Sequence, residues 1–280
     1  MRKSPLRLTA GAITLTLAAA SFANAQIALV TYDMSANPGR FINPSQEPAT
    51  VAPGLTASHI TRGPGVRDAS LSGGFSADGW STVTSEMDGR ANALANGEFF
   101  TFSIGVEVGT TLSISNLDHN LRRSAVNGPS HFEWQYSLDG FTTAGKTIKP
   151  VGSEWDSFGW TNDYFTYYGR NGDNSNYSPD PDEPFGYMLQ RVDFQDPSEM
   201  PIFELGAIED LQNIPGGETV TFRLYGWGND KTTPTNTVAF RNEGLIVNGT
   251  VIPEPSTYAL IFGAAGLGAA FMIRRRRKST

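Results

Sequence analysis

The chain has 280 residues, of which 21 are Lys or Arg and 28 are Asp or Glu, and its formal net charge is −7. It contains no cysteine, which excludes a disulfide framework, a thiolate metal site and a cysteine nucleophile. Three basic residues lie near the N-terminus and five at the C-terminus, so the charge is unevenly distributed. The two terminal segments therefore need to be considered apart from the rest.

The N-terminal segment has the pattern of a secretory signal peptide. Basic residues precede an apolar stretch from Leu8 to Phe22, and Ala23-Asn24-Ala25 supplies small residues around a cleavage position. The basic residues are Arg2, Lys3 and Arg7. We expect residues 1–25 to direct export through the general secretion machinery, and the mature chain to begin near Gln26.

Residues 26–252, the predicted ectodomain, have the length of one domain of β-sandwich size. They contain 13 Lys or Arg and 27 Asp or Glu, a formal net charge of −14. This charge argues against nucleic acid and against anionic membrane surfaces as partners. Without disulfides, the stability of the domain has to come from core packing.

Short apolar alternations predict strands in the ectodomain. The predicted strands are Ile27–Tyr32, Leu55–Thr61, Phe99–Ile104, Thr111–Asn116, Phe132–Leu138, Thr219–Tyr225 and Leu245–Ile252. In Phe132–Leu138 large apolar residues alternate with Glu133, Gln135 and Ser137, which predicts one buried and one solvated face. A short helix is expected over Glu204–Leu211.

Turn dipeptides in which Asn or Asp precedes Gly are frequent in the ectodomain, as expected where many strands reverse. They occur at Asp78-Gly79, Asp88-Gly89, Asn96-Gly97, Asn127-Gly128, Asp139-Gly140, Asn171-Gly172 and Asn248-Gly249. No long stripe of period 3.6 is present. The fold is therefore predicted to be all-β, with a jelly-roll-like antiparallel β-sandwich between the signal peptide and a C-terminal transmembrane helix.

A cluster of aromatic residues begins at Trp155 and gives a candidate glycan-binding platform. The sugar-facing side chains would be Trp155, Trp160 and Tyr164, because sugar rings stack on flat aromatic faces. The alternative is that these residues anchor a long loop or belong to the core.

The next segment, Asp173 to Glu183, is rich in side-chain oxygens of the kind that Ca²⁺ prefers. Its spacing does not fit an EF-hand, which needs Gly and Glu at fixed positions. A solvated acidic loop explains the composition as well, and we predict no metal site.

No catalytic constellation is evident. His59, His119 and His131 lie in separate segments and are expected to be surface or strand-end residues. Glu133 and Asp139 are the acidic pair considered for glycoside hydrolysis, but a solvated strand face and a hairpin turn explain them. We therefore predict a non-enzymatic protein with no catalytic residue and no cofactor.

Residues 253–280 form the third segment. Pro253, Glu254 and Pro255 lead into Tyr258–Ile273, a run of 16 residues without charge. As a helix it would be about 24 Å long, which is short for a bilayer core of about 30 Å. The basic cluster that follows would keep the C-terminus on the cytoplasmic side, and it consists of Arg274, Arg275, Arg276, Arg277 and Lys278.

The two prolines around Glu254 should keep this segment from joining either the preceding strand or the following helix, and so expose an extended peptide to a processing enzyme. A rigid spacer before an ordinary membrane anchor is the alternative explanation of the same residues.

This order of Pro-Glu-Pro, apolar segment and arginine cluster resembles the PEP-CTERM sorting signal. The resemblance implies recognition by an exosortase, a membrane-embedded enzyme similar to cysteine proteases, in a bacterium that makes exopolysaccharide. It also implies transient anchoring in the inner membrane, then export to the cell surface or extracellular matrix. The ectodomain is similar to the all-β bodies that often precede this signal, with matching pieces at 28–33, 122–124, 128–129, 137–141 and 222–226.

We therefore expect an exported, non-enzymatic surface or matrix protein that associates with exopolysaccharide. Two alternatives remain, namely a polysaccharide hydrolase or lyase on the same sandwich, and an adhesin or self-associating matrix component. A cleft that holds two or three carboxylates would favour the enzyme, and flat exposed faces would favour the adhesin.

Overall fold

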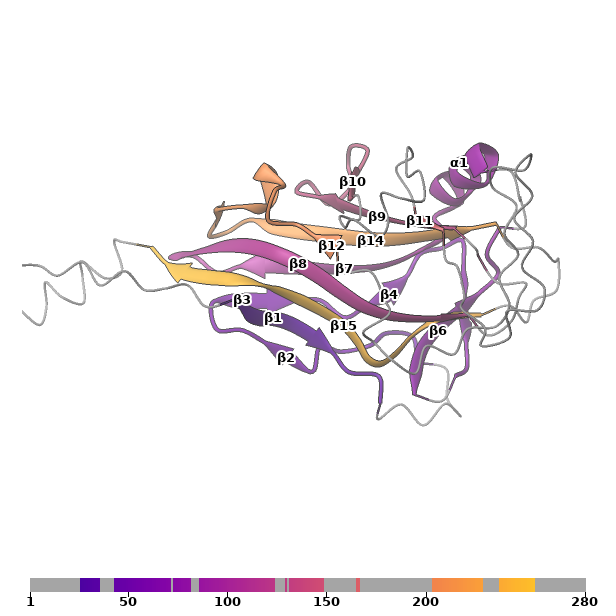
Figure 1. The fold of residues 1–280 in the computed structure, drawn as a ribbon, viewed down its shortest axis with the longest axis horizontal. Coiled ribbons are helices and arrows are strands. Elements are labelled where there is room, and N and C mark those ends of the chain that lie inside the picture. The colour runs from indigo at the N-terminus through magenta and orange to yellow at the C-terminus, as the bar shows by residue number, and fades with distance from the viewer. Residues whose placement is uncertain are drawn as a thin grey trace, which may run out of the picture.

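The computed structural model describes residues 26–35, 43–71, 73–81, 86–123, 129, 131–148, 165–166, 203–228 and 237–254. These residues form two antiparallel β-sheets packed into a sandwich, with one short helix (Figure 1). The prediction of a mostly-β sandwich is confirmed. None of the described helices is long and apolar enough to cross a bilayer, and the predicted segment Tyr258–Ile273 lies outside the described residues.

The first sheet is built around its two longest strands, β8 (Thr110–Arg123) and β15 (Val238–Pro253). Its main order is β12-β8-β15-β1-β2, with β1 at Ile27–Tyr32, β2 at Thr50–Val51 and β12 at Phe203–Glu204. Three further strands attach to this path, namely β13 (Ile214–Pro215), β6 (Gly74–Asp78) and β5 (Arg67–Ala69). Strand β15 pairs with β8, β1 and β6, so it is the central strand of the sheet.

The second sheet has β14 (Thr219–Trp227) at its centre, between β9 (His131–Ser137) and β7 (Phe99–Val106). Its order is β10-β9-β14-β7-β3, with β10 at Lys146–Ile148 and β3 at Leu55–Ala57. The short strands β11 (Phe165–Thr166) and β4 (Thr61–Arg62) pair with β9 and β7.

The core lies between the two sheets and follows from the alternation seen in the sequence. In β14, Val220, Phe222 and Leu224 are fully buried, as predicted. The rings of Phe102 and Phe222 are stacked with centroids 5.1 Å apart, and the Phe100 ring meets Phe240 of the opposite sheet at 5.1 Å. These contacts join β7, β14 and β15 across the sandwich.

Most of the predicted strands are present, but their lengths differ. Strands β8 and β15 are longer than predicted, because each continues past a change in its apolar pattern. The predicted strand Leu55–Thr61 is divided into β3 and β4. The prediction of a helix over Glu204–Leu211 is largely wrong, since only Glu209–Leu211 forms a single 3₁₀ turn.

The helix α1 (Glu86–Asn96) was not predicted. Asp88-Gly89 lies inside it, so the interpretation of that dipeptide as a turn is wrong. Gly97 has φ +72° and Glu98 N–H donates to the Ala93 carbonyl at 2.9 Å, which is the Schellman arrangement that ends a helix. The helix has few apolar residues, and it is held by Ala93, which packs in a cluster with Phe99, Tyr225 and Trp227.

Asn248-Gly249 is not a turn either, because it lies within β15 at a register shift. A Cβ on Gly249 would meet the Ser113 carbonyl oxygen at 2.1 Å, so glycine is needed where β15 closely approaches β8. The predicted turn at Asp139-Gly140 is confirmed, since Gly140 has φ +69° in the turn after β9, whereas Gly79, with φ +83°, follows the end of β6 without forming a turn.

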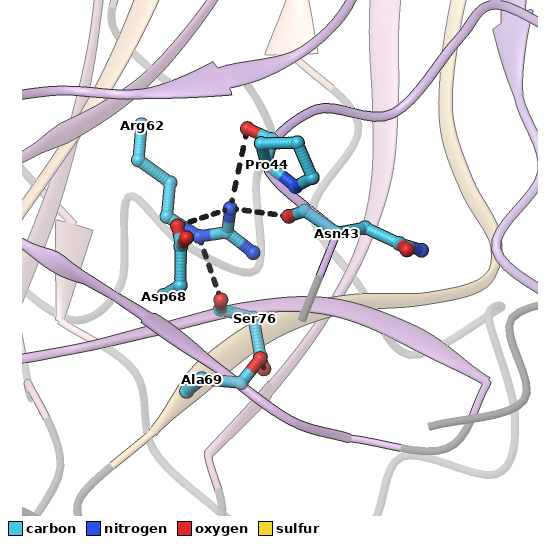
Figure 2. Close-up of polar contacts among 6 residues, drawn as sticks. All are labelled: Asn43, Pro44, Arg62, Asp68, Ala69 and Ser76. Carbon is cyan, nitrogen blue, oxygen red and sulfur yellow. Dashed lines mark hydrogen bonds and ion pairs between the residues drawn. The ribbon is translucent and has the colours of Figure 1, made fainter. Parts of the chain in front are cut away.

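A buried arginine connects the loop before β2 with β4, β5 and β6 (Figure 2). Arg62 donates to the carbonyls of Asn43 and Ser76 at 2.8 and 2.7 Å and to the Asp68 carboxylate at 2.8 Å. Its guanidinium lies 3.8 Å from the centre of the Phe75 ring. Burial lowers the pKa of Arg62, while the nearby Asp68 charge opposes this change. The contacts hold one edge of the sandwich together.

Candidate functional site

The Pro-Glu-Pro segment begins inside the first sheet, at the end of β15. Pro253 pairs in register with Thr110, and Glu254 N–H donates to the Gly109 carbonyl at 2.9 Å. Pro253 and Glu254 are both half-buried. The chain thus passes directly from the central strand into the segment, at the end of the sandwich opposite α1 (Figure 1).

The prediction that the prolines keep this segment off the preceding strand is therefore wrong. In an antiparallel pair, alternate residues direct their N–H and C=O groups toward the partner strand. Since Glu254 N–H points at Gly109, the nitrogen of Pro253 points away from β8. No described strand pairs with β15 on its other side at this position, because β1 begins at Ile27 opposite Gly249. Proline is tolerated at such an edge position.

Three turns surround the end of β15, and we call them the collar: Gly54, the β7–β8 hairpin turn Glu107–Thr110, and 216–218. Glu107 N–H donates to the Gly54 carbonyl at 2.9 Å, and Gly217 N–H donates to the Val106 carbonyl at 2.8 Å. The Thr110 hydroxyl lies 2.6 Å from the Glu107 carbonyl and 3.2 Å from that of Gly54. These bonds fix the hairpin that pairs with Glu254.

The collar approaches the end of β15 closely because its glycines carry no side chain. Gly54 has φ +83°, and a Cβ there would lie 2.8 Å from Thr110 Cγ2 and 3.3 Å from Val251 Cγ1. A Cβ on Gly216 would meet the Glu107 carbonyl oxygen at 2.6 Å. At the tip of the hairpin, Val108 is 89% exposed. The collar is therefore a compact backbone structure with one protruding apolar side chain.

Both ends of the described domain lie beside the collar. Ile27, the first residue of β1, pairs with Gly249, only four residues before Pro253. The opposite end carries α1, which packs where Phe99 begins β7 and Trp227 ends β14. An eight-residue strand such as β7 spans about 25 Å, which separates the two ends.

The sequence from the end of β15 onward decides the identity of this site. Residues 251–278 match the PEP-CTERM protein-sorting motif. The match confirms the resemblance and includes Pro253, Glu254, Pro255 and the arginines Arg274 to Arg277. The PEP-CTERM motif implies processing by an exosortase and sorting of an exported protein to the cell surface. No curated protein and no solved structure matches the chain.

Several predicted site residues lie outside the described residues. They are the candidate platform Trp155, Trp160 and Tyr164, the acidic segment Asp173 to Glu183, Pro255, and Arg274, Arg275, Arg276 and Arg277. Next to the platform, Phe165 pairs with Phe132 and Thr166 with His131. This pairing places Phe165 and Thr166 beside the half of β9 that lies near α1.

The expectation of a solvated face on β9 is wrong. All seven residues of the strand are buried, and Glu133 is completely so. Its carboxylate accepts hydrogen bonds from Arg90 Nε and Nη2 at 2.6 and 2.8 Å, from Gln135 at 2.6 Å and from Thr147 at 2.8 Å. Because Arg90 comes from α1, the helix covers Glu133, one residue of the face that the alternation assigned to solvent. Glu133 links α1, β9 and β10.

Asp139 lies in the turn after β9, as predicted. It accepts hydrogen bonds from the Ser137 hydroxyl at 2.6 Å and from the Thr143 hydroxyl at 2.6 Å. These hydroxyls hold the pKa of the Asp139 carboxyl well below its usual range. Both acidic residues considered for catalysis therefore have structural partners.

The prediction for the histidines holds for His59, which is exposed, and for His131, which begins β9. It is wrong for His119, which lies buried within β8. The His119 ring contacts those of Trp134 and Phe203, with centroids 5.8 and 5.4 Å away, and burial lowers its pKa to about 3. Among the residues that the structure describes, no three His, Cys, Asp or Glu side chains form a group that could hold a metal ion.

The collar was missed at the sequence level, although one signal for it was present. Glu107-Val108-Gly109 separates two predicted strands and so indicates a tight hairpin. Its contact with Glu254, however, is made across about 145 positions of the chain, and sequence spacing does not give strand register.

Proposed function

We propose that this protein is a non-enzymatic β-sandwich with jelly-roll-like connections that acts at the cell surface, in association with exopolysaccharide. In this proposal residues 1–25 direct export, residues 26–252 form the working domain, and residues 253–280 sort it. The tail helix holds the protein in the inner membrane until an exosortase cuts near Pro253-Glu254-Pro255. The sandwich then remains at the surface or in the extracellular matrix.

The observation that carries the proposal is the PEP-CTERM motif at the end of the central strand. Because β15 pairs with β8, β1 and β6, the motif continues the central strand of the first sheet, although at Pro253 the described pairing is with β8 alone. Cutting beyond Glu254 would leave every described strand intact. The sorting step thus separates the tail from a complete domain.

The non-enzymatic assignment is supported by what the acidic residues do. Four hydrogen bonds occupy the Glu133 carboxylate, and its complete burial keeps it from any substrate. The hydroxyls around Asp139 lower its pKa, which is the opposite of what a general acid requires.

The association with polysaccharide is supported by the aromatic residues Trp155, Trp160 and Tyr164 and by the attachment of Phe165 near α1. That end of the sandwich is the one farthest from the tail. A ligand there would be reached from the cell exterior while the tail is still in the membrane.

Sorting is tested by the intact mass of the protein recovered from the surface of the producing cells. We expect a mass that lacks both the signal peptide and the segment that follows Pro253-Glu254-Pro255. A Glu254→Ala variant should retain the tail. Recovery of the wild-type protein with its tail intact would mean an ordinary membrane anchor and would refute the sorting role.

Glycan association is tested separately with the Trp155→Ala/Trp160→Ala double variant. We expect the wild-type protein to be retained on the exopolysaccharide of the producing cells and the variant to lose retention. Phe141→Ala, an aromatic replacement in the β9–β10 turn, is the matched control. Equal retention of wild type and double variant would refute the glycan platform.

A further inference from the structure

The Pro-Glu-Pro motif does not begin free of the sandwich, because Pro253 is the last residue of β15 and Glu254 is hydrogen-bonded to the β7–β8 hairpin. Pro253 pairs with Thr110, and Glu254 N–H is bonded to the Gly109 carbonyl at 2.9 Å. The collar supports this pairing through the bonds of Glu107 and Thr110 to Gly54. An enzyme that binds an extended peptide has to compete with β8 for these residues.

The distance from the sheet to the apolar segment is short. Only Pro255, Ser256 and Thr257 separate Glu254 from Tyr258, so four Cα steps span at most about 14 Å. Half of the difference between a whole bilayer and its hydrocarbon core is about 5–7 Å, and the headgroups occupy this part. About 7–9 Å remains between the folded sandwich and the membrane surface, which is less than the diameter of one helix.

A processing enzyme therefore lacks the space to hold the motif while the last pairs of β15 stay closed. An extended peptide of five or six residues is about 17–20 Å long. To obtain that length on the ectodomain side of Tyr258, residues from Val251 onward have to leave β8. The strand pairs that have to open include Val251 with Leu112 and Ile252 with Thr111.

We propose that the end of β15 must separate from β8 before the exosortase can bind the PEP-CTERM motif, so that the sandwich limits the rate of its own release. This inference rests on the proposed sorting of the chain through its tail. One hydrogen bond changes an opening equilibrium by about five-fold, so two or three terminal bonds reduce the open fraction by about 25- to 100-fold. Terminal strands open locally without unfolding the domain.

A disulfide between the paired residues tests the proposal. Thr111 and Ile252 are in register, and paired Cα atoms in antiparallel sheets lie about 4.5–5.5 Å apart, within the range of a disulfide. The chain has no other cysteine, so within one chain Thr111→Cys/Ile252→Cys can form only this bond. After a pulse label in the producing cells, we expect the oxidised full-length variant to lose its tail at least 10-fold more slowly than wild type. Alkylation followed by mass measurement shows whether the bond has formed.

A second variant separates strand opening from damage to the fold. A Gly-Ser-Gly-Ser insertion between Ile252 and Pro253 moves the motif away from the sheet, and we expect it to speed processing by about 5-fold or more. The same insertion in the cysteine variant should restore at least the wild-type rate, although the disulfide is still present. The two single cysteine variants are the controls for export and for the rate without a bond.

The outcomes distinguish this inference from the proposed function. If the wild-type protein keeps its tail, the sorting proposal fails. If wild type loses its tail and the locked variant is processed at the same rate, strand opening is not required. If the oxidised cysteine variant is processed equally slowly with and without the insertion, the disulfide slows processing for a reason other than the pairing of β15 with β8, and the inference is refuted.

Discussion

Replacement of Arg90 by Met tests the structural role of the contact between α1 and β9. The change leaves the fully buried Glu133 carboxylate with only the donors of Gln135 and Thr147. Removing one partner of a buried ion pair costs about 3–5 kcal/mol. Because Arg90 is one-third exposed and two donors to Glu133 remain, we expect Arg90→Met to lower the unfolding free energy by about 3 kcal/mol. For a domain of this size that loss lowers Tm by about 6–12 °C.

The assay is urea unfolding of residues 26–254, with tryptophan fluorescence as the measure of the unfolded fraction. Arg67→Met is the matched control, since the Arg67–Asp78 pair is also a hydrogen-bonded ion pair, at 2.9 Å, but its arginine is mostly exposed. It should cost less than about 1 kcal/mol. The Arg90→Met/Glu133→Gln double variant should recover about 2 kcal/mol, because the buried charge is then absent. If Arg90→Met costs no more than Arg67→Met, the carboxylate does not depend on α1 and the reasoning is wrong.

Two further predictions concern His119 and Gly249. Since burial lowers the pKa of His119 to about 3, the unfolded chain binds a proton below its own pKa of about 6.5 while the folded protein does not. The unfolding free energy is therefore not reduced by His119 above pH 6.5, and it falls as the pH falls toward 3. The expected decrease between pH 7 and pH 5 is about 2 kcal/mol. Between pH 7 and pH 5 the unfolding free energy of His119→Gln should fall by about 2 kcal/mol less than that of the wild-type protein. An equal fall in the two proteins would contradict the prediction. Gly249→Ala should lower the unfolding free energy by about 1–3 kcal/mol, because the added Cβ meets the Ser113 carbonyl. Gly206→Ala is the control, since a Cβ there would have no atom closer than 3.9 Å, and it should change the unfolding free energy by less than about 0.5 kcal/mol. Equal costs for the two glycines in urea unfolding would refute that reasoning.

The sandwich could be predicted from local patterns because a strand with one inward face shows its period in the sequence. In β14, Val220, Phe222 and Leu224 alternate with residues that are less buried, and the strand was correctly predicted. Strand β9 has the same alternation, yet both of its faces are buried. At Glu133 the difference comes from α1, which lies about 40 residues earlier in the chain and supplies Arg90. No local pattern in β9 indicates that a charged partner covers Glu133.

The dipeptides of Asn or Asp with Gly show the same limit. They indicate positions where the backbone departs from regular geometry, and Gly140 does so in a turn. Gly97 ends a helix, and Gly249 permits close contact of two strands. The residue type predicts the local need for glycine, whereas the neighbouring strands decide whether a turn, a cap or a bulge results.

For the candidate site, the motif was predictable and its surroundings were not. Pro253, Glu254 and Pro255 are recognised by their order before an apolar segment and basic residues. That Pro253 joins β15 depends on the register with Thr110, and this register is set by core residues such as Leu112 and Val247. Tertiary packing therefore makes Pro253 the last residue of β15 instead of leaving it outside the strand.

The positions of the two ends of the sandwich separate sorting from any ligand-binding role. The collar, the beginning of β1 and Pro253 at the end of β15 lie at one end, whereas α1 and β11 lie at the other (Figure 1). Because about 25 Å of strand separates them, a glycan bound near Phe165 would not contact the β8–β15 pairs that control access to the motif. Processing should then proceed at the same rate with or without exopolysaccharide. Changes at the collar, in contrast, should alter release without altering retention on the glycan.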